Sequence, residues 1–303
     1  LVQVFIFVQE TKANSEYFVF MSRLQLSDQQ KSFFECFGYV VMPGLLKDSI
    51  GEIQDAFEEV WSRRDANDGH EHDGTRRSMI VPFIDQHERL CALLDAPKIE
   101  KLVEGLLGEG FNYVGSDGNF YVGDSQWHSD RWISEVRFVK VAFYLDSLKS
   151  GSGCLRVLPG SHRLGDRYSQ QLQANVKDSM LISASERWGI SGSDVPAAAL
   201  ETEPGDVVVF AHNLKHAAFG GGSRRRMFTI NCCERVPDRH LNILHDCISY
   251  HARGYGIDSM YDEKMLATAG PQRLKHLAQV LANQGHMVAE VEKWQAQQGI
   301  SQK

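Results

Sequence analysis

The spacing of apolar residues predicts helices at the start of the chain. Ser27 and Gln30 have the pattern of a capping box, which opens a helix that Gly38 can end. Farther along, apolar residues recur at helical spacing, and Pro97 suits the first turn of a helix. The predicted helices are 27–38, 48–64 and 97–107, and a short strand is predicted at 39–42.

From residue 111 onward the pattern changes to short β-rich runs. The longest run, 136–145, alternates apolar and polar residues at first and then becomes wholly apolar, which is typical of a strand that becomes buried on both faces. Turn residues at 150–153 and 204–206 separate such runs. The predicted strands are 111–114, 119–122, 136–145, 154–158, 207–210 and 227–233. Their number and shortness predict an antiparallel sandwich or barrel, and hence a mainly β fold with flanking helices.

The irregular parts of the pattern suggest a domain organisation. Residues 161–203 are rich in Ser, Gln, Asp and Ala, and are expected to be a long insertion between strands of the kind that forms binding loops. Pro271 opens an amphipathic helical stretch that continues to about residue 298. Met21 precedes the first helix, so 1–20 are expected to be an upstream extension or a cloning-derived addition. We expect one domain over 21–303, with N-terminal helices in 27–110, a β core in 111–235 and a helical region in 240–300.

Composition narrows the classes of partner. The formal net charge is −7, and the one basic run, 224–226, is short, which argues against nucleic-acid binding. The apolar run 1–8 has no preceding basic residue and is too short for a membrane span. Six cysteines include no C-x-x-C pair, as expected for reduced thiols in the cytoplasm.

A histidine, a serine and an aspartate form an H-x-D triplet at His128, Ser129 and Asp130. In an extended chain the side chains at i and i+2 point the same way, so His128 and Asp130 can bind one ion. His216, farther along, can supply a third ligand. Two imidazoles and one carboxylate on one face of a metal leave the other face open for substrate and dioxygen, so the pattern predicts an oxygenase.

Other histidines offer competing interpretations. The run His70, Glu71, His72 and Asp73 also contains candidate ligands, although it lies in a polar, glycine-containing stretch. His212 is close to His216 in sequence and is expected to support the site rather than to bind the metal.

The order of these motifs resembles the phytanoyl-CoA dioxygenase family of Fe(II)/2-oxoglutarate oxygenases over most of residues 34–235. The segments that carry the resemblance are 37–44, 128–130, 153–162, 205–210 and 216. The resemblance implies a double-stranded β-helix, or jelly roll, in which His128, Asp130 and His216 bind Fe(II). It also implies 2-oxoglutarate as cosubstrate and O2 as oxidant.

In that family a basic residue after the distal histidine holds the far carboxylate of 2-oxoglutarate. A guanidinium suits this role because its planar fork pairs with a carboxylate through two hydrogen bonds. Alignment favours Arg225 and leaves Arg226 as the alternative. The family often has a small hydroxyl residue two positions after the distal histidine, where this chain has Ala218, so one contact to the cosubstrate is expected to come from elsewhere.

The resemblance implies a dioxygenase that hydroxylates, desaturates or cyclises a small molecule at an unactivated C–H bond. Because the family's halogenating relatives replace the carboxylate ligand with a small residue, Asp130 argues against halogenation. Two alternatives remain open: a cupin-like metal enzyme that does not use 2-oxoglutarate, and a ligand-binding jelly roll without catalysis.

Overall fold

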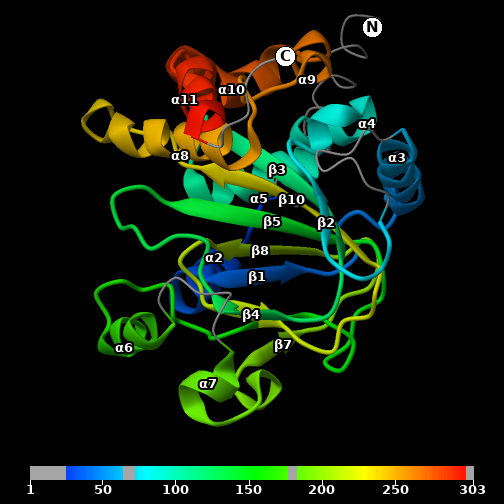
Figure 1. The fold of residues 1–303 in the computed structure, drawn as a ribbon, viewed down its shortest axis with the longest axis vertical. Coiled ribbons are helices and arrows are strands. Elements are labelled where there is room, and N and C mark those ends of the chain that lie inside the picture. Colours follow the sequence, from blue (N-terminus) through cyan, green and yellow to red (C-terminus); the bar gives the residue numbers. More distant parts are fainter. Residues whose placement is uncertain (1–24, 64–71, 177–182, 298–303) are drawn as a thin grey trace, which may run out of the picture.

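The computed structural model describes residues 25–63, 72–176 and 183–297. Two antiparallel sheets lie face to face, with helices packed around them (Figure 1). The larger sheet has the strand order β1-β8-β5-β10-β3-β2, and the smaller has the order β4-β9-β6-β7. This arrangement is a jelly roll, so the predicted fold class is confirmed.

The strands are short except where they form the centre of the larger sheet. Its members are β1 (Tyr39–Met42), β2 (Ser78–Ile80), β3 (Asn112–Tyr121), β5 (Phe138–Tyr144), β8 (Val207–Ala211) and β10 (Arg225–Cys233). The smaller sheet consists of β4 (Ser125–His128), β6 (Leu155–Val157), β7 (Ala198–Leu200) and β9 (His216–Ala218).

Helices from the N-terminal and the C-terminal parts of the chain pack against the larger sheet (Figure 1). The N-terminal group is α2 (Asp28–Phe37), α3 (Ile50–Ser62), α4 (Glu88–Cys91) and α5 (Pro97–Leu107). The C-terminal group is α8 (Leu241–Tyr255), α9 (Glu263–Ala267), α10 (Pro271–Asn283) and α11 (Met287–Gln297). No helix in the described ranges is long and apolar enough to cross a bilayer.

The first helix forms as its sequence predicts. Ser27 and Gln30 exchange the two hydrogen bonds of a capping box at the start of α2. Gly38 ends the helix with φ of 82°, and a Cβ at this position would overlap the ring of His162. The helix therefore ends where the chain needs a left-handed residue and space for a neighbouring side chain.

The prediction of two strands at 111–114 and 119–122 was wrong, because β3 is continuous. Gly115 and Gly118, which lie between the two predicted runs, belong to the strand and permit close packing there. A Cβ at Gly118 would overlap the ring of Phe83, and one at Gly115 would come within 2.7 Å of Nε2 of His251. Near Gly115, which has φ of 125°, the pairing of β3 with β10 shifts as in a β-bulge.

Two further expectations need correction. The segment 161–203 is more regular than expected, since it contains α6 (Arg167–Asn175), α7 (Ala184–Trp188) and β7, which pairs with β6 at the sheet edge. Local caps explain the helices: Asp166 accepts from the N–H of Tyr168, and Ser183 forms a capping box. The amphipathic stretch 271–298 is two helices, α10 and α11, with Gly285 in the break between them.

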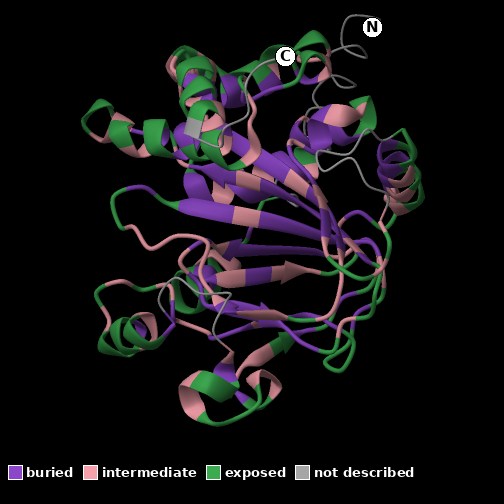
Figure 2. Cartoon of the chain, in the orientation of Figure 1, coloured by how far each residue is buried: buried purple, intermediate pink, exposed green. Residues whose placement is uncertain are grey.

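The buried residues concentrate between the sheets and under the helices (Figure 2). The largest apolar cluster includes residues from α3, α5, β3, β5 and β10 and from the C-terminal helices. A smaller cluster between the two sheets contains Tyr144, Leu155 and Phe210. The expected extension 1–20 lies outside the described residues, and the single-domain organisation remains a prediction.

Candidate active site

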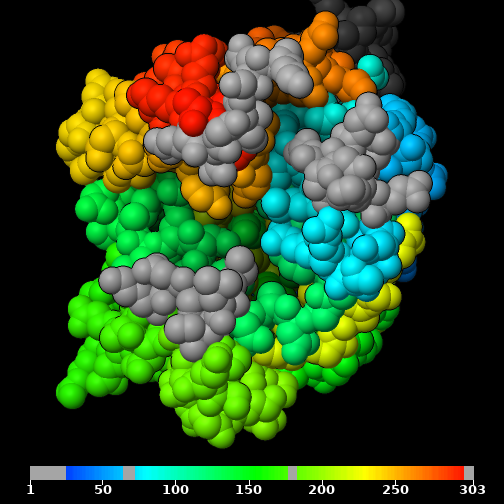
Figure 3. Space-filling model, viewed as in Figure 1, coloured from blue at the N-terminus to red at the C-terminus, as the bar shows by residue number. Residues whose placement is uncertain are grey.

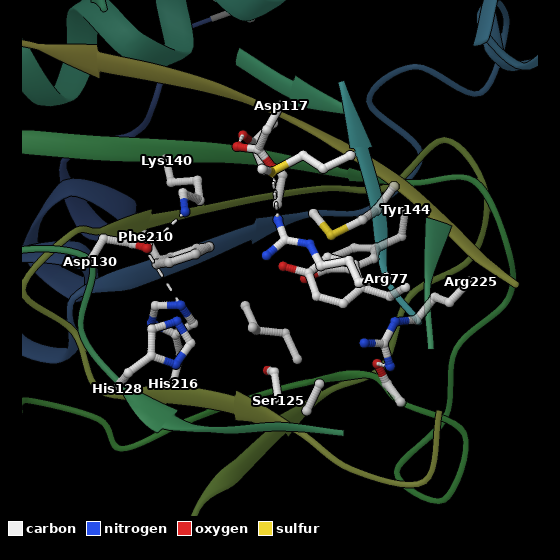
Figure 4. A pocket seen from close by; sticks show the side chains of 18 of the residues that line it. Arg77, Asp117, Ser125, His128, Asp130, Lys140, Tyr144, Phe210, His216 and Arg225 are labelled. Carbon is white, nitrogen blue, oxygen red and sulfur yellow. Dashed lines mark hydrogen bonds and ion pairs between the residues drawn. The ribbon is translucent and has the colours of Figure 1, made fainter. Parts of the chain in front are cut away.

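Three of the predicted site residues meet at the inner face of the smaller sheet. His128 ends β4, His216 begins β9, and the two residues are paired in the ladder. Asp130 follows two residues after His128, and one ligand atom from each of the three side chains lies within 4.8 Å of the other two. Figure 4 shows the two imidazoles together, with Asp130 next to them. Strand pairing therefore brings together residues that are far apart in sequence.

Main-chain contacts orient both imidazoles. Nδ1 of His128 donates to the carbonyl of Gln126 at 2.7 Å, and Nδ1 of His216 donates to the carbonyl of Leu214 at 2.9 Å. Because the proton lies on Nδ1 in this tautomer, Nε2 of each ring is an acceptor. Burial lowers the pKa of both histidines, that of His216 to about 3, so both are neutral near pH 7. Neutral imidazoles with free Nε2 lone pairs are in the form that binds a metal.

Asp130 has one carboxylate oxygen that is free to bind a metal ion. Its backbone N–H donates to the carbonyl of His212 at 2.9 Å, and its Oδ1 accepts from Nζ of Lys140 at 2.9 Å. Oδ2 is buried without a hydrogen-bond partner among the described residues, 3.9 Å from Nε2 of His216. Burial alone would raise the pKa of this carboxyl, but Lys140 and the neighbouring imidazoles hold it far below its ordinary value. A divalent metal would accept the unpaired lone pairs of Nε2 of both histidines and of Oδ2 of Asp130, so the three residues fit the predicted ion.

The competing histidines lie elsewhere. The ring of His72 contacts Oγ of Ser78 and the carbonyl of Ser223, and within the described residues neither it nor Asp73 belongs to a group of potential metal ligands. His70 and Glu71 lie outside the described residues. His212 supports the site through its carbonyl, while its ring lines a neighbouring cavity.

The two candidate arginines point to opposite sides of β10. Arg225 lines the cavity that contains the histidines, and its residue is only 6% exposed. Its Nη1 donates to the carbonyl of Gly153 at 2.9 Å, whereas Nε has no partner among the described residues. Arg226 points away and binds the carboxylates of Asp146 and Glu58. Of the two, only Arg225 has a guanidinium that faces the cavity.

A cavity of about 740 Å³ connects these groups. Its walls come from both sheets and from α8, and Figure 4 shows Arg225 on the opposite side from the histidines. Sequence interpretation missed several polar lining residues, because nothing in their local patterns distinguishes them: Arg77, Asp117, Tyr121, Ser125, Lys140 and Tyr144.

Ser125 supplies a hydroxyl where the sequence suggested that one was missing. It is the ladder partner of Ala218, on the adjacent strand of the smaller sheet, and both residues line the cavity. In Figure 4 Ser125 lies between the histidines and Arg225. The hydroxyl that Ala218 lacks is therefore available from the neighbouring strand.

A jelly roll with two histidines and one aspartate grouped beside an open cavity is the arrangement typical of mononuclear non-haem metal oxygenases. A family model matches residues 34–227, and the chain belongs to the phytanoyl-CoA dioxygenase (PhyH) family. It is thus an Fe(II)/2-oxoglutarate-dependent oxygenase, as the sequence predicted, with dioxygen as the oxidant.

Several solved structures share the fold. SnoK, a non-haem α-ketoglutarate-dependent carbocyclase from nogalamycin biosynthesis, has 21% identity and a TM-score of 0.54, covering 72% of this chain and 90% of its own. EctD from S. alaskensis has 22% identity and a TM-score of 0.51, with 68% and 76% covered. HygX from Streptomyces hygroscopicus, with nickel and 2-oxoglutarate bound, has 14% identity and a TM-score of 0.55, with 69% and 88% covered. No curated protein matches the chain.

Proposed function

We propose that this oxygenase hydroxylates an unactivated C–H bond of a small molecule. In this proposal His128, Asp130 and His216 hold Fe(II), and Arg225 holds the distal carboxylate of 2-oxoglutarate. The observation that carries the proposal is that a group of three potential ligands and a buried guanidinium face one cavity from opposite sides.

The protein's own residues prepare this chemistry. The carbonyls of Gln126 and Leu214 fix the tautomers of the two histidines, and Lys140 directs one oxygen of Asp130 away from the metal position. Arg225 keeps N–H groups free to pair with a carboxylate, in a buried site where that pairing is strong. Bound Fe(II), with 2-oxoglutarate and dioxygen, supplies the oxidising power to remove hydrogen from an unactivated carbon.

The cavity supports a small-molecule substrate. Its volume of about 740 Å³ is within the range of sites for drug-sized ligands, roughly 300–1,000 Å³. Asp130 supplies a carboxylate ligand, so no ligand position is left for a halide, which favours hydroxylation over halogenation. Because SnoK, which shares the fold, is a carbocyclase, ring closure is the alternative outcome of the same hydrogen removal.

The first experiment is an anaerobic titration of the Fe(II)-loaded protein with 2-oxoglutarate, followed by visible absorption and by metal content. A charge-transfer band should appear in the wild type and be lost, together with bound iron, in Asp130→Ala. Asp73→Ala is the matched control, because Asp73 belongs to the competing histidine-rich run and should leave both readouts unchanged.

The outcomes separate the alternatives. Bound iron without the band would favour a cupin-like metal enzyme that does not use 2-oxoglutarate. Failure of the wild type to bind iron would favour a ligand-binding jelly roll. Once a substrate is found, turnover under ¹⁸O2 tests hydroxylation, since hydroxylation adds one labelled oxygen to the product whereas desaturation or ring closure adds none. The cytoplasmic location stays a prediction.

A further inference from the structure

Arg77 brings a second guanidinium into the cavity from the segment before β2. Its Nε donates to Oδ1 of Asn119 at 2.7 Å, and its guanidinium carbon lies 4.3 Å from the centre of the Tyr121 ring. Figure 4 shows Arg77 projecting into the middle of the cavity, between Asp117 and the metal-binding side. Asn119 and Tyr121 thus fix the direction of a charged group that the proposed cofactor chemistry does not use.

The outer nitrogens of Arg77 are poorly satisfied by the protein. Nη2 contacts Sδ of Met79 at 3.2 Å, a weak acceptor, and lies 3.8 Å from Oδ2 of Asp117, which is too far for a hydrogen bond. Among the described residues Nη1 has no hydrogen-bond partner, and 32% of the side chain is exposed. A guanidinium has five N–H donors, so most of those of Arg77 remain available to a ligand.

Asp117 orients Arg77 without occupying its donors. Its carboxylate accepts from Oγ1 of Thr229 at 2.5 Å and from Nδ2 of Asn119 at 2.6 Å. Lys140 is already bound to Asp130 at 2.9 Å. Asp117 thus has two hydrogen-bond donors nearer than Arg77, with which it forms a longer ion pair at 3.8 Å.

The charges of the cavity leave one positive charge in excess. Three cations, Arg77, Lys140 and Arg225, line it together with two carboxylates, those of Asp117 and Asp130. Fe(II) and the 2-oxoglutarate dianion cancel each other. Among the described lining residues, the loaded site thus retains one cationic charge for the substrate to neutralise.

We propose that Arg77 binds a single carboxylate of the substrate, and that the substrate is an aromatic or apolar monocarboxylic acid. This inference rests on the proposed function of the same cavity. A guanidinium fork pairs with a carboxylate through two parallel hydrogen bonds, which would fix the orientation of the substrate. A coenzyme A thioester fits the site less well, because its several phosphate charges exceed the single unmatched positive charge.

The residues that line the cavity with Arg77 suit the apolar part of such a substrate. Tyr250 and Tyr255 of α8 line the cavity with Met79, and the two tyrosine rings lie edge to face with centroids 5.9 Å apart. Residues 72–86, cyan, and α8, gold, flank the same face of the molecule (Figure 3). The cavity that contains Arg77 is thus partly lined by aromatic side chains, which favours a ring or an alkyl chain in the acid that Arg77 binds.

The test compares acids with their uncharged amides. Calorimetry with the Fe(II)- and 2-oxoglutarate-loaded protein, under anaerobic conditions, would use 3-phenylpropionate, octanoate and benzoate, each against its primary amide. The wild type should bind at least one acid more tightly than its amide, and Arg77→Gln should weaken that acid roughly 10- to 100-fold while leaving the amide unchanged. Arg77→Lys keeps the charge but loses the planar guanidinium fork, so its affinity for the acid should lie between those of the wild type and Arg77→Gln.

Arg76→Gln is the matched control, because Arg76 is the exposed neighbour and does not line the cavity. It should bind each acid as the wild type does. Affinity for 2-oxoglutarate and melting temperature, measured on every variant, check that the site remains folded.

Three results would overturn the inference: no acid binds the wild type more tightly than its amide, Arg77→Gln binds the acid normally, or Arg77→Gln loses 2-oxoglutarate instead. The last would assign Arg77 to the cosubstrate. Failure of the proposed function gives a different pattern, in which the wild type does not bind iron or 2-oxoglutarate while the preference for acids over amides persists in the unloaded protein.

Discussion

The carbonyl of Gly153 accepts a hydrogen bond from Nη1 of Arg225 at 2.9 Å, and the same glycine leaves the space that the guanidinium occupies. A Cβ at position 153 would overlap Nη1. The sequence predicted only a turn here, and Gly153 does have φ of 88°. The turn between β5 and β6 therefore also positions a side chain on β10.

This contact predicts that Gly153→Ala weakens 2-oxoglutarate binding. The added methyl group displaces the guanidinium, so the dissociation constant for 2-oxoglutarate should rise roughly tenfold, with a stability cost of about 1 kcal/mol from the left-handed backbone. Calorimetry and thermal unfolding would measure the two effects. Gly151→Ala, in the same turn with open space around it, should change neither; equal effects at both positions would contradict the steric explanation.

The opposite orientations of Arg225 and Arg226 predict that substituting one weakens 2-oxoglutarate binding and substituting the other lowers stability. Arg225→Gln should raise the dissociation constant for 2-oxoglutarate roughly 10- to 100-fold, because a charge-assisted pair is lost. Arg226→Gln should leave that constant unchanged and lower the melting temperature, because Asp146 loses its ion pair and Glu58 keeps only Arg224. The reverse ranking in the titration would assign the cosubstrate to Arg226.

The pairing of Ser125 with Ala218 predicts that a hydroxyl group at either position can serve the cosubstrate. If Ser125 donates to 2-oxoglutarate, Ser125→Ala should weaken binding of the cosubstrate roughly two- to tenfold, the range for one neutral hydrogen bond. Adding Ala218→Ser should restore most of the affinity, because the two positions are ladder partners and both line the cavity. A double variant no better than Ser125→Ala would show that the hydroxyl acts elsewhere.

Asp85 predicts a pH-dependent contribution to stability. It is fully buried, accepts from the hydroxyl of Tyr113 at 2.7 Å, and burial raises its pKa to about 7. The folded state therefore keeps this proton longer than the unfolded chain, whose carboxyl titrates near 4, so the free energy of unfolding falls as the pH rises from about 4 to about 7.

The decrease from this one group is at most on the order of 4 kcal/mol. In Asp85→Asn, where an amide replaces the carboxyl, that part of the slope should vanish, and the variant should gain stability relative to the wild type between pH 5 and 8. Urea unfolding across that range would measure the difference. Asp48→Asn, at a largely exposed carboxyl, is the control, and a parallel slope in wild type and Asp85→Asn would refute the assignment.

The prediction of the fold depended on patterns that act over a few residues. The capping box of Ser27 and the apolar alternation of β5 determined local structure directly, because their contacts lie within one turn or one strand. The pattern was misleading at Gly115 and Gly118, where glycine usually marks a break. These glycines serve long-range packing against His251 and Phe83, which no local window contains.

The same division applies to the site. The sequence by itself determined the candidate ligands, because His128 and Asp130 share a side of an extended chain and the order of the motifs indicated His216. It favoured Arg225 but left Arg226 as the alternative, since a shift of one residue in strand register reverses every side chain. In the tertiary structure Arg225, and not Arg226, lines the cavity, together with Arg77, Ser125 and Lys140. These three come from different segments, and only the packing of two sheets and a helix makes them neighbours.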